Sequence, residues 1–352
     1  RSTIIGESLS RLLELQGHSV IRDNHLGDWG TQFGILLYAI KREGISLEKL
    51  GGDPVAKLEE LYRKGNSWVK ENEESLAEAR MELLNLQQGN NENILLWEKI
   101  RELSMISFEK VYKLLDVTFD HSLGESFYRD KVEEVYKSLL AHKICIKDQG
   151  ALVVFHPEHK RFAKQPFIIR KSDGASNYAT TDLATLSYRT EEWNADQIIY
   201  VTDGRQQDHF EQLFLTAKKW FPAESQKLPQ LSHVWFGTIL GEDNKAIKTR
   251  DGQPVKLMDL LGEAIQRASK MVKEKNPEIE EHEVERRAKI IGLGAVRYAD
   301  LSQDRTLDYV FSWDKLLALQ GNTAPYLQYA VARIHSIFRK TNRRSDELLN
   351  PE

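Results

Sequence analysis

The chain has 352 residues, of which 41% are hydrophobic, and its 49 basic and 53 acidic residues give a formal net charge of −4. These values are typical of globular proteins, and they exclude an intrinsically disordered chain, a histone-like polycation and a small disulfide-stabilised scaffold. The length is enough for about two domains, or for one enlarged α/β domain with insertions.

Three features of the sequence bear on the cellular compartment. Cys145 is the single cysteine, so a disulfide within the chain and a cysteine-rich zinc site are excluded, and a reducing compartment is indicated. The longest apolar run, residues 35–40, is about a third of the length needed to cross a bilayer. The first residues lack an initiator Met and the pattern of a signal peptide. We therefore expect a cytoplasmic protein without membrane spans, whose chain begins inside a longer gene product.

The first 42 residues predict a helix, a strand, a loop and a second helix. Apolar residues at helical spacing fill residues 4–16, and Gly17 is the type of residue that ends a helix. A β-branched run follows at 18–22, then a polar loop at 23–32 and a helix at 33–42. This alternation predicts an α/β fold.

The middle of the chain has a different pattern. Residues 54–115 are helical in pattern almost throughout, which indicates an inserted helical segment. Strand-like runs at 117–120, 151–155 and 167–170 surround a helix at 128–142 and predict a small α+β subdomain.

The last half of the chain returns to α/β alternation and ends in helices. The expected elements are a helix at 178–188, strands at 197–201 and 233–239 with a helix at 208–220 between them, a hairpin at 241–248, and helices at 257–275, 280–301 and 314–340. The apolar strand at 197–201 is typical of a buried parallel sheet.

A polar loop at residues 23–32, with the sequence DNHLGDWGTQ, follows the first predicted strand. In open α/β sheets, ligand sites form beyond the carboxyl ends of strands. The alternative is a structural turn in which Asp28 caps the following helix and Trp29 fills the core. The pattern alone leaves both interpretations open.

A second candidate lies at residues 176–182. Tyr178 and Asp182 are four residues apart, so on one helix they share a face. A phenol and a carboxylate there can converge on a cation, and a carboxylate accepts two parallel hydrogen bonds from a guanidinium. The pattern by itself favours another interpretation, in which Thr180 or Thr181 caps the helix and Asp182 complements the helix dipole.

Two further stretches have the composition of phosphate-binding segments. Residues 203–209 lie between a strand and a helix, where backbone N–H groups suit ribose and phosphate, although the spacing matches neither a P-loop nor a dinucleotide fingerprint. Residues 245–252 carry three basic side chains, which suit a transition state that gains negative charge; a solvated hairpin tip is the alternative. His156 and His159 lack a recognised zinc spacing, so no metal site is expected.

Together, and in this order, these stretches resemble the arginyl-tRNA synthetases, a family of class I aminoacyl-tRNA synthetases. The likeness runs from residue 1 to about residue 340. Four segments carry it: RSTIIG at 1–6, VIRDNHLGDWGTQFG at 20–34, YADLS at 298–302 and GNTAPY at 321–326.

The resemblance implies a fold and a reaction. The implied fold is a Rossmann-type parallel-sheet catalytic domain at 1–53 and 173–262, with helical and α+β insertions at 54–172. Residues 263–352 are then a helical linker and the start of an α-helical anticodon-binding domain. The implied reaction is the activation of L-arginine by ATP with Mg²⁺ to arginyl-adenylate, followed by transfer of the arginyl group to the 3′ end of tRNA(Arg). A monomer is expected.

The resemblance also implies roles for individual residues. The arginine pocket comprises Tyr178, Asp182 and Gln207, with Asp182 paired to the guanidinium. The ATP-binding residues are Gly204, Gln206, Lys248 and Thr249. The catalytic residues are Lys248 and Arg250, in a degenerate form of the mobile Lys-Met-Ser-Lys-Ser loop of class I enzymes. Asp28, Trp29 and Gln32 match a sequence signature of the family, but the resemblance assigns them no step of the reaction.

One departure from the family pattern concerns the start of the chain. The family's His-x-Gly-His motif, which binds ATP phosphates, belongs immediately before Arg1. The chain is then either a portion of the enzyme or a catalytically incomplete paralogue that acts as an arginine- or tRNA-binding module.

Overall fold

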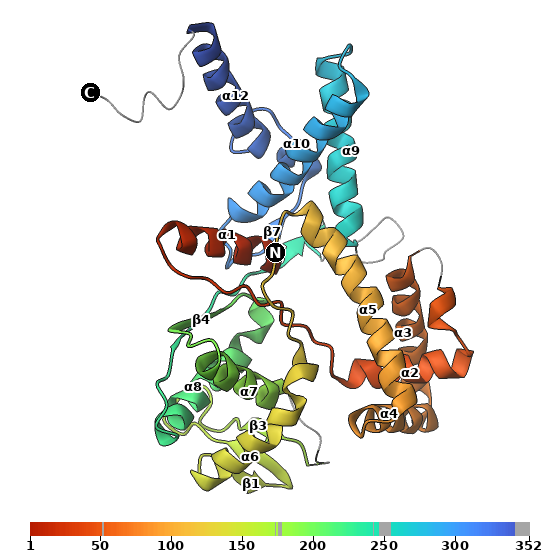
Figure 1. The fold of residues 1–352 in the computed structure, drawn as a ribbon, viewed down its shortest axis with the longest axis vertical. Helices are drawn as coiled ribbons and strands as arrows, with labels where there is room; N and C mark the ends of the chain where they lie inside the picture. The colour runs from red at the N-terminus through yellow and green to blue at the C-terminus, as the bar shows by residue number, and fades with distance from the viewer. Residues whose placement is uncertain (51–52, 173, 175–177, 242, 246–254, 342–352) are drawn as a thin grey trace. The chain divides into compact units, whose positions relative to one another are not determined.

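A computed structural model describes residues 1–50, 53–172, 174, 178–241, 243–245 and 255–341 (Figure 1). The chain forms two compact units. The first unit comprises Arg1–His18, Ile199–Gln207 and the chain from His233 onward, and the second comprises Ser19–Ile198 and Asp208–Ser232.

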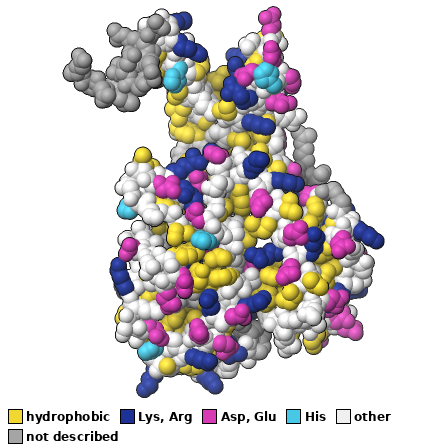
Figure 2. All heavy atoms as spheres, viewed as in Figure 1, with side chains coloured by type: hydrophobic (Ala, Val, Ile, Leu, Met, Phe, Trp, Pro, Cys, Tyr) yellow, Lys and Arg dark blue, Asp and Glu magenta, His cyan; other side chains and the backbone are white. Residues whose placement is uncertain are grey.

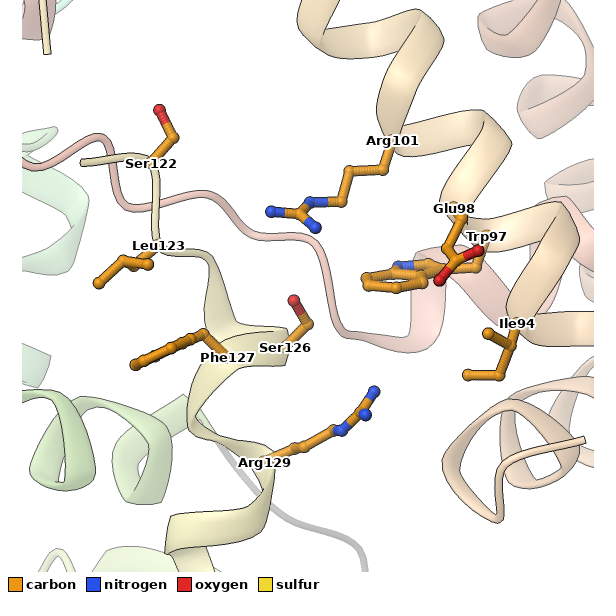
Figure 3. Close-up of a pocket in the computed structure, with 9 residues that line it drawn as sticks. All are labelled: Ile94, Trp97, Glu98, Arg101, Ser122, Leu123, Ser126, Phe127 and Arg129. Carbon is orange, nitrogen blue, oxygen red and sulfur yellow. The ribbon is translucent and has the colours of Figure 1, made fainter. Parts of the chain in front are cut away.

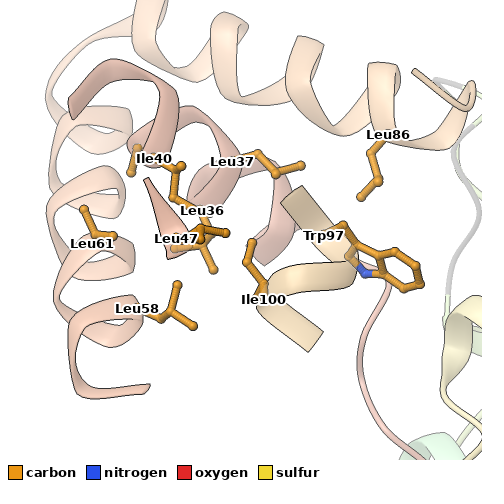
Figure 4. Close-up of a cluster of buried hydrophobic side chains, with 10 residues drawn as sticks. Leu36, Leu37, Ile40, Leu47, Leu58, Leu61, Leu86, Trp97 and Ile100 are labelled. Carbon is orange, nitrogen blue, oxygen red and sulfur yellow. The ribbon is translucent and has the colours of Figure 1, made fainter. Parts of the chain in front are cut away.

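The helical part of the second unit is a group of packed helices. Its elements are α2 (Thr31–Glu43), η1 (Leu47–Lys49), α3 (Pro54–Glu71), α4 (Glu73–Gln87) and α5 (Asn91–Leu114). Figure 4 shows their shared core, formed by Leu36, Leu37, Ala39, Ile40, Leu47, Leu58, Leu61, Leu86, Trp97 and Ile100. The side chain of Asp53 accepts a hydrogen bond from the backbone N–H of Ala56, which fixes the start of α3. The helical pattern predicted at 54–115 is confirmed.

The remainder of the second unit combines a small sheet with helices. Strands β1 (Ile146–Asp148), β2 (Ala151–Val154) and β3 (Phe167–Arg170) form an antiparallel sheet in that order. The helical elements are η2 (Glu125–Lys131), α6 (Val132–Ala141), α7 (Tyr178–Glu191) and, from Asp208 onward, α8 (Gln207–Ala223). Helix α7 packs on β3, α6 and η2, and this packing positions the candidate site.

The first unit is mainly helical. Its elements are α1 (Ser2–Leu15), η3 (Gly204–Gln206), β6 (Ile239–Leu240), α9 (Leu257–Lys275), α10 (Glu281–Leu301), β7 (Tyr309–Val310), α11 (Trp313–Leu316) and α12 (Ala324–Thr341). Helix α10 packs against α9 and contacts α1 and α12. A buried ion pair of 2.6 Å between Arg1 and Asp300 joins the start of α1 to α10.

Short pairings complete the fold, which mixes helix and sheet. Strands β4 (Gln197–Tyr200) and β5 (Gln230–His233) pair with each other, and β6 pairs with β7 in parallel. Isolated parallel bridges join Asp23 to His121 and Asp203 to Phe236.

The strands predicted at 18–22 and 117–120 are wrong. Between these two segments the structure has only the Asp23–His121 bridge and a few neighbouring hydrogen bonds, such as that from the N–H of Asn24 to the carbonyl of His121 at 2.8 Å. A strand needs a continuous ladder of partners, and β-branched composition alone does not supply one.

Two more predicted elements are divided in the structure. The strand predicted at 233–239 is replaced by the end of β5 and the start of β6, because Phe236 and Gly237 donate to different carbonyls, those of Thr202 and Arg305. The helix predicted at 314–340 becomes α11 and α12. Gly321 has a φ of +86°, and Thr323 accepts a hydrogen bond from the N–H of Tyr326 at the new helix start.

The surface carries both signs of charge. Figure 2 shows basic and acidic side chains interspersed on the face in view. Among the described residues, no helix is both long and apolar enough to span a membrane.

Candidate active site

Helix α7 begins at Tyr178 and brings Asp182, four residues later, onto the same face. Tyr178 is 59% exposed, whereas the side chain of Asp182 is only 14% exposed. The interpretation of Thr180 or Thr181 as a helix cap is wrong, because both lie inside α7. The hydroxyl of Thr180 instead donates to the carbonyl of Ile169 in β3. Asp182 is therefore a shielded carboxylate beside an accessible phenol.

Two histidines lie close to the Asp182 carboxylate. His209 Nε2 is 2.6 Å from Asp182 Oδ2, and His25 Nε2 is 3.9 Å from Asp182 Oδ1. The His209 ring also meets the Tyr178 ring edge to face, with 4.8 Å between centroids. Burial lowers the pKa of His25, an effect opposed by the charge of Asp182. A neutral His25 leaves the negative charge of Asp182 available to a cationic ligand.

Glu125, at the start of η2, is a second carboxyl group of this site. Burial, with smaller contributions from Asp182 and Asp28, raises its pKa to about 7. A cation bound beside Asp182 would stabilise the ionised form of Glu125 through the same electrostatic coupling.

The raised pKa makes stability depend on pH. The folded protein keeps a proton on Glu125 that the unfolded chain releases above its pKa of about 4.5, so Glu125 lowers the free energy of unfolding as pH rises towards 7. We expect Glu125→Gln to be more stable than wild type at pH 8, by up to about 3 kcal/mol, and nearly equal at pH 4.5. Urea unfolding at both pH values tests this. A difference that does not change with pH would contradict it.

Asp23 and Arg189 form a buried ion pair between the loop at 23–32 and α7. Asp23 Oδ2 accepts from Arg189 Nη2 at 2.7 Å, and their side chains are 7% and 9% exposed. The pair attaches the loop at 23–32 to α7. It therefore holds the loop residue His25, two residues from Asp23, close to Asp182 on α7.

Asp28 connects the loop to η2 and α5. Its carboxylate accepts from the backbone N–H of Ser126 at 2.9 Å and from the Ser126 hydroxyl at 2.8 Å, and it lies 3.2 Å from Arg101 Nε. Its backbone carbonyl accepts from the indole of Trp97 at 2.8 Å. The interpretation of Asp28 as a helix cap is wrong, since the N-cap of α2 is Gly30, without a side-chain cap.

This close packing requires a glycine at position 124. A Cβ there would lie 2.3 Å from Asp28 Oδ1 and 2.4 Å from its Cγ. We expect Gly124→Ala to lower the free energy of unfolding by about 2 kcal/mol or more, because the Asp28–Ser126 contacts must break. Gly27→Ala, with no atom within 4 Å of the added Cβ, is the matched control. Equal melting temperatures for the two variants would contradict this expectation.

The second unit contains a pocket of about 210 Å³, and Trp29 contacts two of the residues that line it. The residues that line it are Ile94, Trp97, Glu98, Arg101, Ser122, Leu123, Ser126, Phe127 and Arg129. Figure 3 shows Arg101 on α5 and Arg129 on η2, with Ser126 between them in this view. Trp29 packs edge to face on Trp97 with centroids 5.4 Å apart, and the Arg129 guanidinium lies 5.1 Å from the Trp29 ring centroid. Trp29 is partly buried in the core, while Gln32 is exposed.

The segment predicted to bind ATP follows β4 in the first unit. The N–H of Gly204 donates to the carbonyl of Phe236 at 2.9 Å, and Asp203 accepts from the N–H of Arg205 at 2.8 Å. A Cβ at Gly204 would lie 3.1 Å from Trp235 and 3.3 Å from the Phe236 carbonyl oxygen. A larger residue at position 204 would therefore crowd Trp235 and the backbone of Phe236, which is one physical reason for a glycine there.

The other predicted site residues are placed as follows. Gln206 is exposed in η3, and Gln207 begins α8 and belongs to the first unit, whereas Tyr178 and Asp182 belong to the second. Lys248, Thr249 and Arg250 lie outside the described residues. In the part of the chain that the structure describes, no group of three or more His, Cys, Asp or Glu side chains could hold a metal ion.

Four residues of the site received no role from the sequence. His25 and His209 lie within polar stretches that were recognised, but their contact with Asp182 depends on the fold. Glu125 and Arg189 lie in segments without a motif, so no sequence signal marked them.

Comparison with solved structures places the fold among the class I aminoacyl-tRNA synthetases. Arginyl-tRNA synthetase from Plasmodium falciparum is similar, with a TM-score of 0.78 and 32% identity, over 96% of this chain and 55% of that one. Arginyl-tRNA synthetase from Thermus thermophilus shares the fold, with a TM-score of 0.74 and 22% identity over 96% of this chain and 61% of that one.

The family follows from the sequence comparison. The family model described as tRNA synthetases class I (R), catalytic domain, matches residues 1–313, so the chain belongs to this family. An arginine–tRNA ligase from Cellvibrio japonicus is 43% identical over 100% of this chain and 61% of its own length. Another, from an Enterobacter species, is 42% identical over 99% of this chain and 61% of its own length. The chain thus spans about 60% of the length of these relatives.

Proposed function

We propose that the protein is an arginine–tRNA ligase, which activates L-arginine with ATP to arginyl-adenylate and transfers the arginyl group to the 3′ end of tRNA(Arg). The observation that carries the proposal is the shielded Asp182 carboxylate beside Tyr178 on α7, in a chain of the arginyl class I family.

In this proposal the guanidinium of arginine binds at the start of α7. The carboxylate of Asp182 accepts its N–H groups, and the phenol of Tyr178 borders the same space. Once the bound cation has stabilised its ionised form, Glu125 adds to the attraction, because it interacts electrostatically with Asp182. Gln207, at the start of α8, is the third residue that the family resemblance assigns to arginine.

We assign ATP to the segment that follows β4 in a catalytic domain of Rossmann type at 1–53 and 173–262. Gly204 and Gln206 lie on this segment, and Lys248, Thr249 and Arg250 would supply positive charge as the α-phosphate is attacked. Mg²⁺ would arrive bound to the ATP phosphates, because it is usually held in such sites by substrate phosphates and its own waters. The insertion at 54–172, the helical region at 263–352, a cytoplasmic location and a monomeric state are parts of the same proposal.

The proposal is tested by arginine-dependent exchange of pyrophosphate into ATP, with and without tRNA, on the protein as its gene encodes it. Lysine and citrulline are the controls. Exchange that requires both arginine and tRNA supports the proposal. Arginine binding without exchange or aminoacylation would favour the alternative, a catalytically incomplete arginine- or tRNA-binding module.

A further inference from the structure

We propose that His209 is a positioning residue that sets the orientation of the Asp182 carboxylate and so contributes to selectivity for arginine. The inference rests on the proposed function, because it concerns the same pocket. It starts from the 2.6 Å contact between His209 Nε2 and Asp182 Oδ2.

The hydrogen bond from His209 restrains the Asp182 carboxylate and leaves lone pairs on it that can accept hydrogen bonds from a ligand. A carboxylate only accepts hydrogen bonds, so His209 Nε2 carries the proton of this contact. Each carboxylate oxygen has about two lone pairs, so Asp182 Oδ2 can accept from His209 and from a ligand together. The contact fixes the rotation of the Asp182 carboxylate, which otherwise turns easily because this terminal torsion is soft.

Orientation matters for this ligand in particular. The guanidinium group is planar and forms two parallel hydrogen bonds only when the plane of the carboxylate matches its own. A carboxylate that is held in place before binding loses less conformational entropy when the ligand arrives. His209 therefore affects the affinity for arginine without touching the reacting carboxyl group of the substrate.

His209 is itself held by surrounding aromatic rings. Its ring centroid lies 4.8 Å from that of Tyr178, 5.2 Å from that of Phe210 and 5.6 Å from that of Phe167. The side chain is 14% exposed. One imidazole thus contacts both the phenol and the carboxylate of the predicted pocket. His25, at 3.9 Å from Asp182 Oδ1, is beyond hydrogen-bond distance and cannot replace it.

The test compares His209→Leu with His209→Gln, whose amide can place a donor near the position of Nε2. We expect His209→Leu to raise the KM for arginine about 10- to 100-fold while kcat and the KM for ATP stay within about threefold. His209→Gln should restore most of the arginine affinity. The control is His159→Gln, since His159 Nε2 contacts Glu211 of the same helix α8 at 3.0 Å and lies outside the pocket; it should behave like wild type.

Three results of these experiments would overturn either the role of His209 or the proposed function. An unchanged KM for arginine in His209→Leu would overturn it, provided that wild type responds to arginine. Equal losses in His209→Leu and His209→Gln, with a lowered melting temperature and weaker ATP use, would show a purely structural role and would also overturn it. A wild-type protein that neither binds nor activates arginine would instead overturn the proposed function itself.

Discussion

Asp182→Asn should abolish the preference for arginine over citrulline. The substitution keeps the size of the side chain but replaces a charged acceptor with a neutral amide, so a guanidinium loses its ionic partner while the neutral ureido group of citrulline does not. Removing one partner of a shielded ion pair costs about 3–5 kcal/mol, which corresponds to more than a hundredfold in affinity. The side chain of Asp182 is 14% exposed, so solvent screens only part of this interaction.

The measurement is calorimetric titration of both ligands into wild type and variant. Asp196→Asn is a matched control, because Asp196 pairs with Lys227 at 2.8 Å but its side chain is 88% exposed, and pairs of this kind contribute little. If Asp182→Asn binds arginine as tightly as wild type does, the assignment of the arginine pocket to α7 is wrong.

The helices could be predicted because their signal is local. Leu58, Leu61 and Ile100 recur at helical spacing in the sequence and are buried in the core of the second unit. The same spacing also includes Leu84 and Ile106, which are 42% and 45% exposed. Periodicity thus identifies a helix more reliably than it identifies which of its apolar residues are buried.

The strands and the roles of individual side chains were harder to predict, because they depend on contacts with residues far away in the sequence. The carboxylate of Asp28 accepts from Ser126, 98 residues later, and Arg189 binds Asp23 across 166 residues. No spacing rule relates such positions, so the sequence could suggest only a local role for Asp28, as a helix cap. The shared face of Tyr178 and Asp182 could be predicted because they are four residues apart on one helix.

The family resemblance added what neither periodicity nor spacing could provide. For Asp182, the local pattern favoured a dipole-complementing role, whereas the resemblance assigned it to arginine. In the structure Thr180 and Thr181 lie inside α7 and do not cap it. The interpretation that competed with an arginine-binding role for Asp182 included such a cap, so the structure weakens that interpretation. The roles of Gln207, Gly204, Lys248 and Arg250 stay predictions.

Arg189→Leu should lower the free energy of unfolding by about 3–5 kcal/mol, because it leaves the Asp23 carboxylate buried without its cation. The two side chains are 9% and 7% exposed, and their 2.7 Å contact joins the loop at 23–32 to α7. The double variant Asp23→Leu/Arg189→Leu removes both charges and should recover a large part of the lost stability, since no uncompensated charge is left buried. Urea unfolding of wild type, Asp23→Leu, Arg189→Leu and the double variant gives the coupling energy directly. A double variant that is destabilised by the sum of the two single effects would show that the residues act independently, and that the loop is held by other contacts.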